Sequence, residues 1–117
     1  MALEADLNTL LKTVFARVYP DIAPDPLPAR PYCTYQQVGG ESVTFIDRTL
    51  PGLRNARMQI NVWSNTRLEA ATLARQVEDL LRLATVFQVQ PLGALVSDYE
   101  PILKLYGTRQ DFSVFSI

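Results

Sequence analysis

The sequence contains no histidine and only one cysteine, Cys33. A lone cysteine cannot close an intrachain disulfide, and without histidine the usual Cys/His ligand sets for zinc cannot form. The absence of histidine also removes the commonest base that activates a serine, threonine or cysteine nucleophile. We therefore interpret Cys33 as a small strand residue packed inside the domain. We expect no catalytic residues, no bound metal and no cofactor.

Clustered positive charge is also lacking. The only lysines are Lys12 and Lys104, the arginines are spread from Arg17 to Arg109, and the formal net charge is -1. Affinity for a phosphate backbone comes from clustered Lys and Arg, so this composition argues against specific nucleic-acid binding. No apolar run approaches the ~20 residues that span a bilayer, and the first residues lack signal-peptide features. We expect a cytoplasmic protein without membrane contact.

What is present is a composition typical of globular proteins. The 117 residues are 48% hydrophobic and 20% charged, close to the averages for folded domains. We find no internal repeat and no composition shift that would mark a linker. Residues 1–117 are therefore predicted to form one domain.

The first predicted helix comes from apolar residues that recur at helical spacing from Leu3 onward. We expect it to end near Tyr19, because Pro20 stops it. Four further prolines follow, at positions 24, 26, 28 and 31. A segment with so few amide donors is predicted to be an extended connector. The alternative is a polyproline ligand at Pro28 and Pro31.

Two strands are predicted by alternating side chains. Residues 32–38 place Cys33 and Tyr35 on one face. Residues 54–63 place Met58, Ile60 and Val62 on one side and Trp63 on the other. Between these strands, residues 42–46 are predicted to form either a short strand or the start of a loop.

The second helix is predicted to start at Thr66, because Thr66 and Glu69 have the spacing of a capping box. Its apolar positions run from Ala70 to Ala84. Residues 92–100 and 105–116 are interpreted as two further strands. The predicted fold is therefore α+β, with two helices on one face of a mainly antiparallel four- or five-stranded sheet. The predicted order is α-β-(β)-β-α-β-β.

Asp98 and Glu100 lie two residues apart, so both carboxylates would project from one face of a strand. They could share a cation or act as an acid and base pair. No third ligand lies nearby in the sequence. We therefore interpret them as part of a solvated strand face beside the turn at Pro101.

The connection from Glu41 to Leu53 is long for a small domain, and long connections are often functional. Apolar side chains in an exposed loop are explained if a partner covers them, although a short strand could also bury two of them. Trp63 could anchor a partner or belong to the core or its rim. The candidate assembly contacts are Val43, Phe45, Ile46, Asp47, Arg48, Leu50 and Trp63.

A family resemblance covers nearly the whole chain. The residues that carry it are Val18-Tyr19-Pro20, Ala23-Pro24, Pro31-Tyr32, Gly52-Leu53, the stretch from Arg57 to Trp63, and Asp111-Phe112-Ser113-Val114. In this pattern of turns and strand faces the chain resembles the tail-completion, or head-tail joining, proteins of long-tailed bacteriophages and prophages. None of these residues forms a catalytic signature.

The resemblance implies a structural protein of phage assembly. Proteins of the family are thought to cap the finished tail tube as a ring, often of six subunits, and to join it to the filled head. The implied partners are copies of the chain itself, tail-tube proteins and head-connector proteins. The implied location is the virion tail or the head-tail junction.

Three rival functions follow from the same residues. A double-stranded RNA-binding domain shares the order α-β-β-β-α, but it binds phosphates with lysines near its last helix, where this chain has Thr66-Arg67-Leu68-Glu69. A small enzyme would have to use Asp98 and Glu100 in one closed pocket. A stand-alone protein-binding adaptor domain is the third rival.

Overall fold

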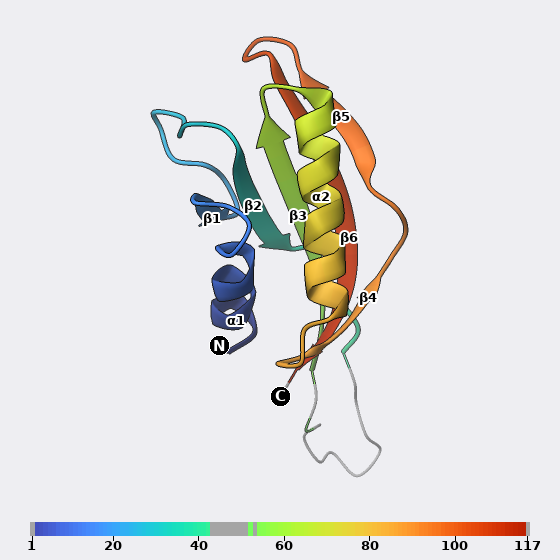
Figure 1. Cartoon of the computed structure of the whole chain (residues 1–117). Coiled ribbons are helices and arrows are strands. Elements are labelled where there is room, and N and C mark those ends of the chain that lie inside the picture. The colour runs from blue at the N-terminus through green and yellow to red at the C-terminus, as the bar shows by residue number, and fades with distance from the viewer. Residues whose placement is uncertain (1, 43–51, 53, 117) are drawn as a thin grey trace.

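A computed structural model describes residues 2–42, 52 and 54–116 (Figure 1). Two helices and six strands follow one another along the chain. Their bounds are α1 Ala2–Leu11, β1 Val18–Pro20, β2 Tyr32–Gln37, β3 Arg54–Ser64, α2 Arg67–Arg82, β4 Gln88–Pro91, β5 Val96–Glu100 and β6 Leu105–Ser116.

The six strands form one mixed sheet in the order β1-β2-β3-β6-β4, and β5 also pairs with β6. Only β1 and β2 run parallel; the other pairs are antiparallel. The two longest strands, β3 and β6, form the centre, and their register runs from Arg54 opposite Ser116 to Ser64 opposite Tyr106. The predicted α+β class is confirmed, but the sheet has six strands where four or five were predicted, and it is mixed because β1 and β2 run parallel.

Both helices contribute to a core on one face of this sheet. In Figure 1, α2 lies along β3 and β6, and α1 lies nearer β1 and β2. The buried core side chains come from both helices and from the central strands. They include Leu3, Leu7, Leu11, Ala74, Val77, Leu81, Met58, Ile60, Val62, Phe112 and Val114. The predicted apolar side of residues 54–63 therefore faces the helices.

The prediction that the first helix extends to Tyr19 was wrong, since α1 ends at Leu11. Residues 18–20 instead form β1, where Val18 lies opposite Cys33. The Cys33 amide donates to the Arg17 carbonyl at 3.1 Å, and this hydrogen bond joins two parts of the chain. Val18 and Phe15 are still buried. Their apolar spacing therefore reflects burial in a turn and a strand, because pairing with β2 replaces the helical hydrogen bonds.

The predicted start of the second helix is confirmed, with one change in its cap. The Thr66 hydroxyl accepts a hydrogen bond from the Glu69 amide at 3.2 Å, as in a capping box. The Glu69 carboxylate does not return directly to the Thr66 amide. The buried Ser64 hydroxyl lies between them, because it donates to Glu69 and accepts from the Thr66 amide at 3.4 Å.

The strand predicted at 92–100 is shorter than expected and begins at Val96, and β4 was missed. β4 carries Pro91, which cannot donate a hydrogen bond, and prolines in sheets are confined to edges and strand ends. β4 lies at the edge of the sheet, so Pro91 is compatible with pairing to β6. The choice between strand and loop for residues 42–46 lies outside the described residues, except for Ser42, which is in no strand.

Candidate interaction surface

The face of the sheet opposite the helices is covered by neither α1 nor α2. We call it the uncovered face. Side chains of β3 alternate between the two sides, and residues opposite one another in the antiparallel register share a side. From the three central strands the uncovered face carries Tyr32, Thr34, Gln36, Asn55, Arg57, Gln59, Asn61, Trp63, Leu105, Arg109, Asp111, Ser113 and Phe115.

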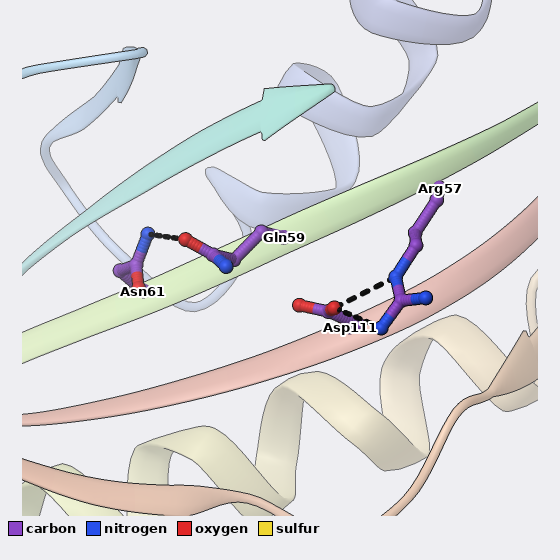
Figure 2. Close-up of polar contacts among 4 residues, drawn as sticks. All are labelled: Arg57, Gln59, Asn61 and Asp111. Atoms are coloured by element: carbon purple, nitrogen blue, oxygen red, sulfur yellow. Dashed lines mark hydrogen bonds and ion pairs between the residues drawn. The ribbon is translucent and has the colours of Figure 1, made fainter. Parts of the chain in front are cut away.

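The middle of the uncovered face is polar, with its central charges paired. Figure 2 shows Arg57 and Asp111 reaching toward one another from β3 and β6, with 2.7 Å between Nη2 and Oδ2. Asn61 is turned toward Gln59 and donates to its side-chain oxygen at 3.4 Å. The Arg57 side chain is 50% exposed, so this ion pair contributes at most about 1 kcal/mol. This region therefore offers amide groups and a neutralised pair, not a phosphate-binding cluster.

One end of the uncovered face contains a hollow of about 420 Å³, which we call the groove. Its floor includes Tyr32, Asn61 and Trp63. One wall is the connector between β1 and β2, and the other is β5 with the turn that follows it. Trp63 lies on the side of β3 that the alternation predicts, opposite Tyr32 of β2. Its candidate role as an assembly contact stays a prediction.

The position of the Trp63 ring depends on Gly107, which faces it across the β3–β6 pair. A Cβ atom added at Gly107 would lie 2.6 Å from both Cε3 and Cζ3 of the indole. Real Cβ atoms do not approach other atoms so closely, so the ring can lie over the backbone only because this residue has no side chain. Gly107 was not among the predicted site residues, although its place two residues after Leu105 puts it on the face of Trp63.

We expect Gly107→Ala to move the Trp63 ring out of the groove floor. Trp63 is the only tryptophan, so its emission maximum should shift to longer wavelength as the indole becomes more exposed. The loss of stability should be about 1–3 kcal/mol, as for other overpacked sites. Fluorescence excited at a wavelength that tryptophan absorbs and tyrosine does not would measure the shift in emission. Urea unfolding would measure the loss of stability. An unchanged emission spectrum would contradict the close approach of this ring to the backbone.

Asp98 and Glu100 share one side of β5, as their spacing predicts, and both line the groove. Each also accepts a hydrogen bond from a nearby backbone amide. Asp98 Oδ1 accepts from Tyr99 at 2.9 Å, and Glu100 Oε2 accepts from Leu103 at 2.6 Å. Among residues 2–42, 52 and 54–116, no three acidic or thiol side chains come together as metal ligands. The groove is open to solvent, unlike the closed pocket that an acid and base pair would require.

Cys33 lies in the core, as predicted, with none of its surface exposed. Burial raises the pKa of its thiol to about 12. The thiolate is the nucleophilic form of cysteine, so Cys33 is unreactive near neutral pH. The raised pKa has a consequence for stability. Burial favours the neutral thiol, so the buried thiol of Cys33 stabilises the folded state at neutral pH. This stabilisation is lost as the pH rises from 9.0 toward about 12, because the thiol then ionises more readily in the unfolded chain.

The remaining candidate contacts lie outside the described residues. They are Val43, Phe45, Ile46, Asp47, Arg48 and Leu50. The structure describes both sides of this segment. Glu41 is held to β3 by a hydrogen bond of 2.9 Å from its amide to the Asn55 side chain. The segment is therefore attached at the end of the sheet where β3 begins.

The fold and this surface define a small two-layer α+β domain with one sheet face that neither helix covers. A family model described as tail completion protein gp17 matches residues 2–115. The chain belongs to this family, and membership assigns it a structural role in phage tail assembly. A search of curated proteins finds no match. In the part of the chain that the structure describes, no helix is long and apolar enough to cross a membrane.

Proposed function

We propose that the protein caps the finished tail tube and joins the tail to the filled head by forming a ring of copies of itself. Its further partners are the tail-tube protein below the ring and the head-connector protein above it. Membership of the tail completion family supports this proposal, because the family has a structural role in phage tail assembly.

Formation of a ring is supported by the difference between the two sides of the domain. One side presents helices, and the other presents the uncovered face with the groove at one end. A contact between unlike surfaces of identical subunits is heterologous, and repeating it produces a closed ring when the rotation between subunits closes. A ring through which DNA passes must also release it, and a net charge of -1 without a basic cluster supports free passage.

The uncovered face is more polar than a permanent interface. Obligate interfaces are large and resemble a domain core cut in half. Here the central side chains are amides and a paired arginine and aspartate. The isolated protein should therefore be a monomer or associate only loosely, and the ring should form when a tail end gathers several copies.

Sedimentation at micromolar concentration and electron microscopy of tails would test this proposal. We expect monomers in solution, and a ring at the tail tip when the protein is added to tails assembled without it. Those tails should then join to filled heads. Joining of heads to tails that lack the protein would refute the proposed function. A hexamer that survives dilution to nanomolar concentration would refute only the loose association.

A further inference from the structure

The groove combines large apolar side chains with an acidic rim. Trp63 and Tyr32 lie in its floor, and Ile22 and Leu103 on its walls are 80% and 43% exposed. Three acidic residues, Asp21, Asp98 and Glu100, also line it, together with Arg109. Exposed apolar side chains gathered in a hollow mark a contact site more often than isolated ones do. This groove therefore fits a segment that carries large apolar residues together with a positive charge.

The walls of the groove are tied together before any partner binds. Arg30, in the connector, donates from Nη2 to the Leu103 carbonyl at 3.2 Å and from Nη1 to the Asn65 side chain at 3.0 Å. The start of the connector is fixed by the Asp21 amide, which donates to the Tyr35 carbonyl at 2.8 Å. A preformed site loses less conformational entropy when it is filled. This favours a binding groove over a gap between loops.

We infer that the groove receives residues 43–50 of a second copy of this chain. The inference rests on the proposed self-association and names the contact that makes it. The segment contains Phe45 and Ile46, with Arg48 two residues further on. The two apolar side chains match the aromatic floor. Arg48 matches the acidic rim, and the neighbouring Asp47 matches Arg109 of the groove. Arginine beside large apolar residues is a composition enriched at the centres of interfaces.

Chain geometry decides that the donor is a second copy. Ser42 lies near the start of β3, where Glu41 contacts Asn55, whereas Trp63 is near the other end of β3. Strands rise about 3.3 Å per residue, so Asn55 and Trp63 are roughly 26 Å apart along β3. Phe45 is three residues from Ser42, and a fully extended chain of that length spans at most about 11 Å. Phe45 therefore cannot reach Trp63 in the groove of its own subunit.

The donor segment is attached at the start of β3, whereas the accepting groove lies near the end of β3. Each copy then gives its segment to one neighbour and accepts a segment from another. Such a contact is heterologous, which is the type that generates rings. The groove also explains why the uncovered face can stay polar in the middle, since the apolar contact is confined to one end.

Trp63 makes the inference directly measurable, because it is the only tryptophan and lies in the groove. The probe is a synthetic peptide of residues 41–53, titrated into the full-length protein while tryptophan emission is recorded. We expect a saturable change in emission. A peptide with Phe45→Ser and Ile46→Ser should bind at least about tenfold more weakly, because apolar anchors carry most of the affinity of a contact.

The acidic rim is tested in the protein. The double variant Asp98→Asn and Glu100→Gln should weaken binding of the unchanged peptide, because it removes the two carboxylates with which Arg48 is inferred to pair. The amide oxygens can still accept the backbone hydrogen bonds that the carboxylates accept. The matched control is Asp79→Asn, an exposed carboxylate on α2 and outside the groove. It should leave binding unchanged.

Unchanged Trp63 emission, or equal binding of the serine-substituted peptide, would overturn the inference. Electron microscopy of tails tests whether the ring forms, and it does so independently of the groove contact. Rings at tail tips together with no peptide binding would overturn the groove contact alone. Peptide binding without rings would support the groove contact and refute the ring.

Discussion

Replacing both Phe45 and Ile46 by serine is expected to abolish the joining of heads to tails. If these side chains dock only on a partner, the free energy of unfolding of the isolated domain should change by less than about 1 kcal/mol, because surface substitutions usually have small effects. The reason for the large functional effect is that these side chains are inferred to fill the groove of the next subunit. Complementation of a phage that lacks the protein measures joining, and urea unfolding measures stability.

Thr44→Ser is the matched control for this experiment, because it changes the same segment without removing an apolar side chain. It should leave both joining and stability unchanged. The opposite result is a loss of several kcal/mol of stability in Phe45→Ser alone, which is the cost of removing a core side chain. That result would show that Phe45 belongs to the core of its own subunit. The assembly contacts would then have to be sought on the uncovered face alone.

Phe112→Ala is expected to cause the largest loss of stability of any substitution considered for this domain, about 3–5 kcal/mol. Phe112 has none of its surface exposed and lies opposite Met58 at the centre of the sheet, on the side of the helices. Its removal leaves a cavity that the surrounding strands and helices can close only in part. Small domains are stable by about 5–15 kcal/mol, so this loss is a large fraction of the total. Urea and thermal unfolding measure it.

Phe115→Ala provides the matched control on the same strand. Phe115 lies opposite Asn55 on the uncovered face and is only partly buried. Less apolar surface is removed from water there, so the loss should be less than about half of that for Phe112→Ala. Equal losses would show that the uncovered face is packed like a core. A surface of that kind would not be available for assembly.

The elements that could be predicted from the sequence are those that depend on neighbouring residues. The cap at Thr66 depends on a hydroxyl and an amide three residues apart, and its hydrogen bond is present. The two sides of β3 follow from alternation, and Met58 is buried while Arg57 is exposed, as predicted. Side-chain direction along a strand repeats every second residue, so no tertiary information is needed to assign it.

The predictions that failed depended on pairing between distant residues. Residues 14–18 have helical apolar spacing, but Val18 pairs with Cys33 in β1 and β2. The spacing of apolar residues indicates which side chains are buried. Burial in a turn or an edge strand can produce the same spacing as burial in a helix. β4 was missed for a similar reason, because its edge position becomes visible only when β6 is in place.

The sequence by itself determined the α+β class, the second helix, the two sides of the central strands and the family. The groove was decided by the tertiary structure, because Arg30, Trp63, Asp98 and Gly107 belong to distant parts of the chain. No periodicity links such residues, since their distances depend on strand order and register. Trp63 was a visible candidate from the start. That it lies over a glycine, between the connector and β5, follows only from how β3 pairs with β2 and β6.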